Sequence, residues 1–336
     1  MGNVGNGLTV DFVDRELEAA VRRTLVRVEE ELRLSVATDD RFVTEAAQHL
    51  VNAGGKRFRP LLVLLTAHLG DPDAPMVVPA AVVMELTHLA TLYHDDVMDE
   101  ADVRRGAPSA NSRWSNSVAI LVGDFLFSRA ADLAADLGAD AVRIQARTFT
   151  RLVRGQIAET VGPAAGEDPV AHYLGVVAEK TGSLIATCAR FGSGFGGAPP
   201  EVVEAVARYG ETIGIAFQLS DDLLDIASES TVSGKTPGTD LREGVPTLPV
   251  LYALASDESD AAAVRLREIL SAGPVTDDAL HAEALALLRE SAALKRARET
   301  VRTYAEDARG QLAPLPDVPA RRALESLCDV IADRTS

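Results

Sequence analysis

The chain is poor in lysine, in aromatic residues, in cysteine and in long apolar runs. Four lysines stand among 33 basic residues, against 50 acidic ones, and the formal net charge is −17. So acidic a protein lacks the basic surface that displaces counterions from nucleic acid, and we expect no nucleic-acid partner. The only two cysteines, Cys188 and Cys328, lie outside any CxxC pair or histidine cluster. A zinc site is therefore not expected, while a disulfide between them stays open.

No apolar run reaches the roughly 20 residues that cross a membrane, so no transmembrane segment is predicted. The first residues show no basic and apolar signal pattern, and we expect a cytoplasmic protein. Residues 1–10 are rich in Gly and Asn and are expected to form a flexible tail. Residues 11–336 show no change in composition that would mark a boundary, which predicts one large domain.

Aromatic residues make up 4% of the chain, whereas Ala and Leu are abundant. Because no alternating strand pattern or fixed-period repeat is found, this composition predicts an all-α fold. Apolar residues recur every three and four positions, first between Leu17 and Leu32. Further helices are predicted at 40–52, 58–70, 76–104, 115–136, 139–160, 169–191, 200–228, 245–256, 260–271, 276–289, 290–312 and 318–333.

Two aspartate clusters of the form DDxxD each follow an apolar-periodic segment. They are His94-Asp95-Asp96-Val97-Met98-Asp99 and Ser220-Asp221-Asp222-Leu223-Leu224-Asp225. The first and last aspartates of each cluster are four residues apart, so on a helix they lie on one face and repel each other. A hard divalent cation removes this cost, and carboxylates with substrate phosphates are the usual surroundings of magnesium.

A solvated acidic helix end is the alternative explanation of such a cluster, and for a single one it would serve equally well. Two copies, each after a strongly apolar helix, favour the metal-binding interpretation. An EF-hand is excluded, because neither cluster has the DxDxDG loop with its closing glutamate.

The basic residues also gather in short motifs. Three of the four lysines stand beside Gly or Thr, in Gly54-Gly55-Lys56-Arg57-Phe58-Arg59-Pro60, Glu179-Lys180-Thr181-Gly182 and Gly234-Lys235-Thr236. Lysine is a flexible point charge for phosphate oxygens, while arginine offers a planar fork. In an acidic protein, such local concentrations of positive charge predict an anionic substrate.

With these motifs the chain resembles the trans-isoprenyl diphosphate synthase family. The matching segments are GGKRFRP (54–60), HDDVMDEADVRRG (94–106), KTG (180–182), FQLSDDLLD (217–225) and GKTPGTD (234–240). The resemblance implies a single-domain antiparallel helical bundle with a deep central cavity, usually a homodimer. It also implies an enzyme that condenses isopentenyl diphosphate with an allylic diphosphate, with Mg²⁺ as cofactor.

The resemblance implies roles residue by residue. Metal binding is expected of Asp95, Asp96, Asp99, Asp221 and Asp225, with Asp222 acting close by. The allylic diphosphate is expected at Arg104, Lys180, Thr181, Gln218 and Lys235. Isopentenyl diphosphate is expected at Lys56, Arg59, His88 and Arg105. The family's second diphosphate-binding lysine is replaced by Val245, which could either weaken binding of the allylic diphosphate or transfer the task to Arg242. The basic C-terminal tail of many farnesyl synthases is missing.

Product length is expected to depend on the residues one turn before the first cluster. Ala90 and Thr91 are small where short-chain members often carry aromatic residues, and Tyr93 falls on another helix face. Gly210 and Gly214 are expected to leave further room on a facing helix. We therefore expect a product longer than C20. A short-chain synthase is the alternative. A terpene cyclase disagrees with the second DDxxD, and a non-catalytic partner subunit disagrees with the presence of both clusters.

Overall fold

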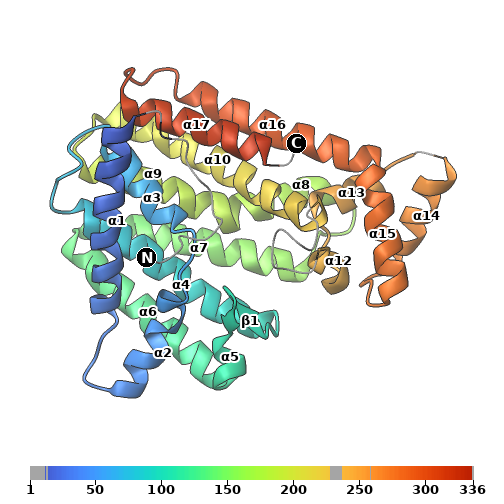
Figure 1. The fold of residues 1–336 in the computed structure, drawn as a ribbon, viewed down its shortest axis with the longest axis horizontal. Coiled ribbons are helices and arrows are strands. Elements are labelled where there is room, and N and C mark those ends of the chain that lie inside the picture. Colours follow the sequence, from blue (N-terminus) through green and yellow to red (C-terminus); the bar gives the residue numbers. More distant parts are fainter. Residues whose placement is uncertain (1–11, 13, 228–236, 258, 335–336) are drawn as a thin grey trace. The chain divides into compact units, whose positions relative to one another are not determined.

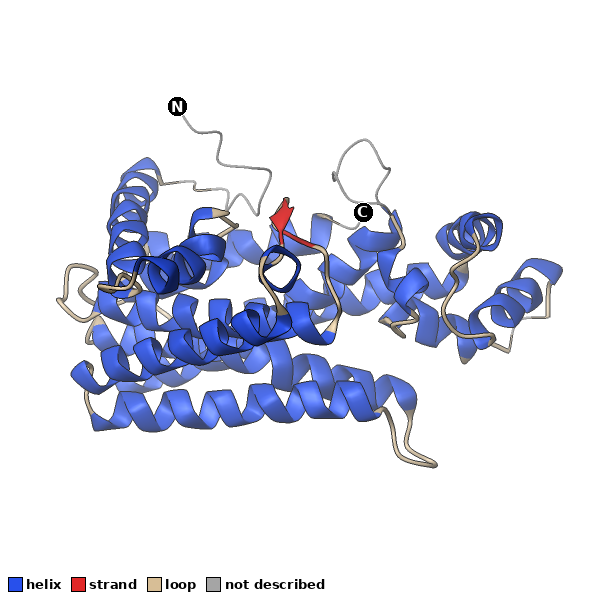
Figure 2. Cartoon of the chain, turned by 90° about the horizontal axis from the view of Figure 1, so that it is seen from below, coloured by secondary structure: helices blue, strands red, loops and turns tan. Residues whose placement is uncertain are grey.

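The computed structural model describes residues 12, 14–227, 237–257 and 259–334. In this part of the chain nearly all regular structure is helical, apart from one short hairpin (Figures 1 and 2). The prediction of an all-α fold is thereby confirmed. Internal contacts divide the chain into two compact units whose segments alternate along the sequence. The expected tail at 1–10 lies outside the described residues, and the single domain expected for 11–336 stays a prediction.

The first unit contains residues up to 150 together with 184–210 and 312–326. Its elements are α1 (Arg15–Ser35), α2 (Arg41–Asn52), α3 (Phe58–Ala67), α4 (Val77–Met98), β1 (Val103–Arg104), β2 (Ala107–Pro108), α5 (Ala110–Arg113), α6 (Asn116–Asp136), nearly all of α9 (Ser183–Phe195), and the first parts of α7 (Ala139–Val161), α10 (Pro200–Ala227) and α17 (Pro319–Asp333).

Helix α4 is the centre of this unit. It packs against α1, α3, α5 and α6 (Figure 1). Between Val77 and Ala90 nearly every side chain is buried, on all sides of the helix. A helix that is apolar all round is stable only inside other elements. The first aspartate cluster therefore stands at the end of the best-supported helix of the unit.

The helix expected at 76–104 is shorter than predicted, because α4 ends at Met98. Glu100 has φ +50°, which stops the helix, and an antiparallel hairpin pairs Arg104 with Ala107. The two residues between them, Arg105 and Gly106, both have positive φ, the conformation of a tight hairpin turn. Gly106 is a turn signal in the sequence, but the predicted helix end rested on apolar periodicity.

The second unit contains residues 151–183, 211–311 and 327 onward. Its complete elements are α8 (Pro169–Val177), the π-helix η1 (Ala178–Gly182), α12 (Thr239–Glu243), α13 (Leu248–Leu254), α14 (Ala261–Ser271), α15 (Asp278–Glu290) and α16 (Ala292–Gln311). Helix α13 is buried against α16, α14, α15 and α8. The remaining parts of α7, α10 and α17 complete the unit.

One further helix prediction was wrong, and two short helices were missed. The single helix expected at 169–191 is interrupted by η1, since residues 178–182 form a π-helical turn between α8 and α9. The short helices α5 and α12 were not foreseen, because four or five residues are too few for apolar periodicity to show. The other long helices agree with their predicted ranges within a few residues.

The two cysteines are buried thiols, and the described residues form no disulfide. Burial raises the pKa of the Cys188 thiol to about 12. Among the described residues, no helix is both long enough and apolar enough to span a bilayer.

Glycines in α9 provide a matched test of helix packing. A Cβ at Gly192 would collide with the carbonyl oxygen of Val63 on α3, whereas Gly194, on the exposed side of the same helix, has nothing within 4 Å. We expect Gly192→Ala to destabilise the protein by about 1–3 kcal/mol through overpacking. Gly194→Ala is expected to stabilise it by about 0.5–1 kcal/mol through helix propensity. Urea unfolding followed by circular dichroism measures both, and equal stability of the two variants would contradict the packing described.

Candidate active site

The first aspartate cluster closes the last turn of α4. Asp95 is half-buried and Asp99 is exposed, and the amide of Asp99 donates to the carbonyl of Asp95 at 2.8 Å. The two carboxylates thus lie one turn apart on the same helix face, as the spacing predicted. Asp96 is fully buried, and its Oδ1 accepts from Nε of Arg104 at 2.5 Å. Its Oδ2 is buried and has no hydrogen-bond partner among the described residues.

Asp96 therefore differs from its two neighbours. Burial raises the pKa of its carboxyl, and Arg104 opposes that rise by attracting the charged form. Arg104 also lies 3.9 Å from Asp99, so one guanidinium links the buried and the exposed aspartate. The role of Asp96 as a metal ligand stays a prediction, with Arg104 as the partner of one of its oxygens.

The residues expected at isopentenyl diphosphate come together in the first unit. Arg105 donates to the carbonyl oxygens of Leu50 and Gly54, the first at 3.1 Å. A Cβ at Gly55 would lie 2.8 Å from Cζ of Arg105, and the φ of +136° at this position also favours glycine. Lys56 follows as an exposed residue, and the hairpin turn is thus anchored to the glycine pair of the GGKRFRP segment.

His88 and Arg59 belong to the same neighbourhood. Burial lowers the pKa of His88 well below its ordinary value, and four arginines add to the shift. These four are Arg59, Arg105, Arg57 and Arg104. The imidazole is therefore neutral at physiological pH, with one nitrogen able to donate a hydrogen bond and the other able to accept one. The four arginines around neutral His88, of which Arg59, Arg104 and Arg105 are predicted substrate residues, form a local concentration of positive charge in an acidic protein.

The second aspartate cluster ends α10, in the second unit. Asp222 is buried; its Oδ1 accepts from Nε2 of Gln218 at 2.9 Å, and its Oδ2 accepts from the hydroxyl of Tyr173. Burial raises the pKa of Asp222 to about 7, with Asp221 and Asp225 adding to the rise and the two hydrogen bonds opposing it. Both carboxylate oxygens of Asp222 thus accept hydrogen bonds from protein side chains.

The outer aspartates of this cluster have partners from distant segments. Asp225 accepts from the amides of Thr239 at 3.3 Å and Asp240 at 3.2 Å, which begin α12. Asp221 accepts from Arg334 at 2.7 Å, just after α17. The sequence had indicated that a basic C-terminal tail is missing, yet a single arginine two residues before the end of the chain contacts the cluster. Nothing in its Asp-Arg-Thr-Ser context signals this contact.

The π-helical turn carries two of the predicted allylic-site residues. Lys180 donates to Glu159 at 2.5 Å, and Thr181 donates to Gln218 at 3.3 Å. Since Gln218 in turn binds Asp222, a chain of hydrogen bonds joins Thr181 to the aspartate cluster. Lone π turns in helical proteins are frequently found at functional sites. Lys235 lies outside the described residues.

Tyr173 also donates a hydrogen bond to Asp222, and the sequence analysis did not indicate this residue. It lies on α8, 49 positions before Asp222. Burial raises the pKa of its hydroxyl well above the ordinary value, and the Asp222 carboxylate adds to the shift. The hydroxyl therefore stays protonated and acts as a donor. No local motif marks it, because only tertiary contact brings α8 and α10 together.

The acidic side chains of the two clusters form the donor set available to a divalent cation. Among the described residues, no group of three or more His, Cys, Asp or Glu side chains could hold a metal ion unaided. Each cluster instead offers two carboxylates one turn apart. That set fits a cation bound by one or two carboxylates whose remaining ligands are water and substrate phosphate oxygens.

The residues expected to control product length are buried in α4. Ala90 has no exposed surface, and the hydroxyl of Thr91 donates to the carbonyl of His88 at 2.8 Å. Tyr93 faces elsewhere, as predicted, since its hydroxyl donates to Ala46 of α2 at 2.6 Å. The expectation for Gly210 was wrong: a Cβ there would lie 2.9 Å from Cα of Ala186, so the missing side chain allows close packing with α9 rather than leaving space.

Arg242 and Val245 follow the GKTPGTD segment. Val245 is 37% exposed, next to α12. Arg242 donates to the carbonyl of Thr276 at 3.2 Å and to Asp278 at 2.8 Å. Its guanidinium is thus held toward the start of α15 in this structure.

Comparison with known proteins identifies the family. The family model for polyprenyl synthetase matches residues 40–288, which contain every motif described above. The chain belongs to the polyprenyl synthetase family. Members of this family are prenyltransferases that depend on a divalent metal, and this chain is accordingly a prenyltransferase enzyme.

Relatives of this synthetase have products of different lengths. A nonaprenyl diphosphate synthase of Mycobacterium tuberculosis is 53% identical over 326 residues, covering 97% of this chain and 96% of the relative. A dimethylallyltranstransferase of the same organism is 44% identical, covering 95% and 97%. Geranylgeranyl pyrophosphate synthase of Corynebacterium glutamicum, solved with calcium and isoprenyl diphosphate, has a TM-score of 0.86 at 45% identity, covering 97% of this chain and 99% of that one.

Removing the hydroxyl of Tyr173 tests the hydrogen-bond chain of the second unit. Asp222 would lose a buried donor, and a hydrogen bond to a charged group contributes about 1.5–3 kcal/mol. We expect Tyr173→Phe to lower kcat/KM for the allylic substrate by about 10- to 100-fold. Tyr252→Phe is the matched control, because its hydroxyl forms a hydrogen bond with Thr300 at 3.1 Å, outside the hydrogen-bond chain that ends at Asp222. Similar losses in both variants, measured by steady-state kinetics, would speak against a specific role of Tyr173.

Proposed function

We propose that this synthetase is a magnesium-dependent trans-polyprenyl diphosphate synthase that adds isopentenyl diphosphate head-to-tail to an allylic diphosphate, with a product longer than C20. The observation that carries the proposal is the pair of DDxxD helix ends, each with two carboxylates one turn apart, accompanied by the arginine-rich neighbourhood of His88. The 53% identity to a nonaprenyl diphosphate synthase supports the long product. Homodimer formation, a cytoplasmic location and one synthase domain over 11–336 are part of the same proposal.

The acidic residues would hold Mg²⁺ around the allylic diphosphate. In the first unit Asp95 and Asp99 supply the paired carboxylates and Asp96 stands beside them; in the second unit the pair is Asp221 and Asp225. Bound magnesium would neutralise the departing diphosphate. Arg104, Lys180 and Lys235 would donate to the same diphosphate and stabilise the charge that develops on it.

The other residues would handle the organic part of the reaction. Thr181 and Gln218 would direct oxygen dipoles at the allylic cation, which apolar walls must protect from water. Lys56, Arg59, Arg105 and neutral His88 would hold isopentenyl diphosphate, so that its double bond attacks in register. The proton lost from the adduct would leave with the released diphosphate.

A short-chain synthase is the second candidate, favoured by the similarity to the dimethylallyltranstransferase and to the geranylgeranyl pyrophosphate synthase. A product assay separates the two. The purified chain would receive Mg²⁺, labelled isopentenyl diphosphate and, in turn, dimethylallyl, geranyl or farnesyl diphosphate. We expect labelled acyclic products longer than C20. Labelled products that stop at C15 or C20 would support the second candidate, whereas an unlabelled cyclic product with isopentenyl diphosphate left unconsumed would point to a cyclase.

Filling the space beside the first cluster tests the control of product length. Ala90 and Thr91 are buried one turn before Asp95, so we expect Ala90→Phe and Thr91→Phe to shorten the product by one or more five-carbon units. Chromatography of the products reports the length distribution of whatever fraction of enzyme folds. Val264→Phe adds the same ring at an exposed position of α14 and should leave the distribution unchanged. Unaltered products from both buried variants would reject this path for the growing chain.

Neutralising one carboxylate in each cluster tests metal binding. We expect Asp95→Asn and Asp221→Asn each to lower kcat by at least about 100-fold and to raise the magnesium concentration needed for half-maximal rate, because a charged ligand is lost. Asp132→Asn, in an exposed pair with Arg129, is the control and should behave as the parent enzyme. A variant with full activity at unchanged magnesium demand would remove its aspartate from the proposed metal site.

A further inference from the structure

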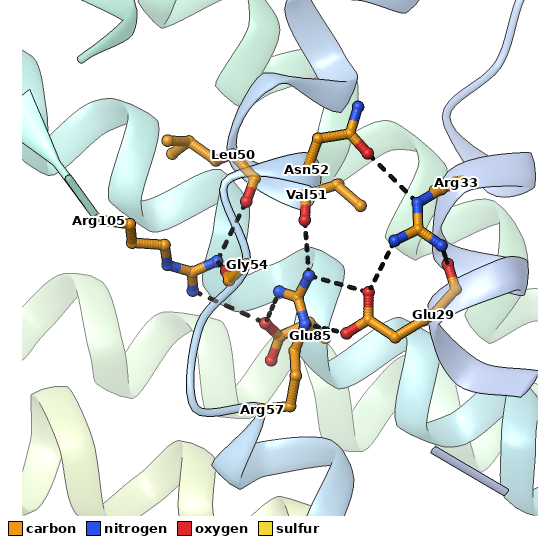
Figure 3. Close-up of polar contacts among 9 residues, drawn as sticks. All are labelled: Glu29, Arg33, Leu50, Val51, Asn52, Gly54, Arg57, Glu85 and Arg105. Carbon is orange, nitrogen blue, oxygen red and sulfur yellow. Dashed lines mark hydrogen bonds and ion pairs between the residues drawn. The ribbon is translucent and has the colours of Figure 1, made fainter. Parts of the chain in front are cut away.

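A buried glutamate lies among the arginines expected to bind isopentenyl diphosphate. Glu85 of α4 is 1% exposed, and its Oε1 accepts from Nη1 of Arg57 at 2.7 Å (Figure 3). The same oxygen lies 3.8 Å from Nη2 of Arg105. Glu85 therefore contacts one arginine without a predicted role and one expected to touch substrate. Neither DDxxD cluster nor the product-length residues include it.

Arg57 is occupied by the protein itself. Its guanidinium also donates to both carboxylate oxygens of Glu29 and, at 2.7 Å, to the carbonyl of Val51 (Figure 3). Only 9% of the residue is exposed. Burial opposes the charged form, but Glu85 and Glu29 outweigh it, and the pKa of Arg57 is raised. A guanidinium whose donors point at protein oxygens is a structural anchor rather than a substrate ligand.

The anchor lies inside the substrate segment. Arg57 stands between Lys56 and Arg59 in the chain, and it is the residue that precedes α3. Its φ is +46°, and the two glycines before it have φ +81° and +136°. An L residue in the left-handed region is held there only when its surroundings determine the conformation. The ion pairs of Arg57 hold its backbone in this conformation. They thereby set the direction in which Lys56 and Arg59 leave the loop.

Glu85 also constrains the second substrate segment. Arg105 is at φ +56° in the hairpin turn, and its guanidinium reaches Gly54 and Leu50 beside Glu85. Glu85 lies three residues before His88 and ten before Asp95, so these three share one face of α4. Glu85 thus contacts both arginines that join the GGKRFRP loop to the hairpin turn, and together with Glu29 it balances their two charges. Without it, these buried like charges would repel each other.

We propose that Glu85 is a positioning residue: through Arg57 and Arg105 its carboxylate holds the 54–59 loop and the hairpin turn in the arrangement that binds the diphosphate of isopentenyl diphosphate. The proposal rests on the proposed assignment of Lys56, Arg59 and Arg105 to that substrate. The positioning role and simple charge balance predict opposite changes in the affinity for isopentenyl diphosphate when this carboxylate is removed. Removing a negative charge beside an anion site should tighten anion binding by Coulomb attraction, whereas loss of positioning weakens it.

Titration calorimetry of the full-length enzyme with isopentenyl diphosphate alone tests the sign, because no reaction occurs without an allylic substrate. Glu85→Gln keeps the size of the side chain and removes its charge. We expect the affinity for isopentenyl diphosphate to fall by about 10- to 100-fold, the range typical of residues that orient a ligand-binding group. Affinity for a non-reactive allylic thiolodiphosphate should change by no more than about twofold. In steady-state kinetics the KM for isopentenyl diphosphate should rise while kcat at saturation stays nearly constant.

Three further variants make the result decisive. Glu204→Gln, in a partly exposed pair with Arg190, is the matched control and should bind both ligands normally. Arg57→Lys keeps the charge but not the planar fork, and should weaken isopentenyl diphosphate binding in the same selective way even if Glu85→Gln folds poorly. Arg105→Gln tests the underlying assignment, and it should lose affinity for the same ligand.

The outcomes are separable. Unchanged or tighter binding of isopentenyl diphosphate by folded Glu85→Gln and Arg57→Lys, while Arg105→Gln binds weakly, would overturn the positioning role and leave the substrate site intact. Equal losses for both ligands would also overturn it, because they indicate a general structural defect. If Arg105→Gln binds isopentenyl diphosphate normally, the assignment of that substrate to these residues fails, and the positioning role fails with it.

Discussion

The pairing of buried carboxylates with arginine is the interaction on which the candidate site depends. Asp96 and Glu85 are both fully buried on α4, and each is compensated by a guanidinium from the hairpin or from the loop before α3. A single charge in such a position would destabilise the fold by several kcal/mol, whereas a hydrogen-bonded pair is tolerated. The arginines therefore serve two purposes: they make α4 possible, and they bring positive charge to a protein whose net charge is −17.

The backbone supports these pairs with unusual conformations. In the described residues, non-glycine positive φ values occur at Arg57, Glu100 and Arg105, all next to the first aspartate cluster or the glycine pair. In the second unit the irregular backbone is the π turn at 178–182, which contains the predicted site residues Lys180 and Thr181. Departures from regular helix thus lie at or next to the residues expected to meet diphosphate. This is the usual distribution of local strain, which a well-packed surrounding scaffold can maintain.

Much of the fold followed from apolar periodicity and turn residues, because most helices are long enough for a 3.6-residue repeat to show. The helix predictions based on periodicity were wrong at segments that carry predicted site residues. At 99–106 the predicted helix gives way to a hairpin, and at 178–182 an extra residue enters the helical turn. The lack of a side chain at Gly210 was interpreted as free space in the site, whereas the backbone of α9 packs directly against it. A sequence records the size of a side chain but not what lies against it.

The sequence by itself determined the helical class, the two acidic helix ends and the basic motifs, because these depend on local composition and spacing. The family resemblance that these motifs carry then indicated the kind of reaction. Only the tertiary structure decided which polar group meets which. Tyr173 with Asp222, Arg334 with Asp221, and Glu85 with Arg57 and Arg105 are separated by 20 to 113 positions. Such pairs leave no periodic trace in the chain, since they form when helices that are distant in sequence pack together and bury charges that must then find partners.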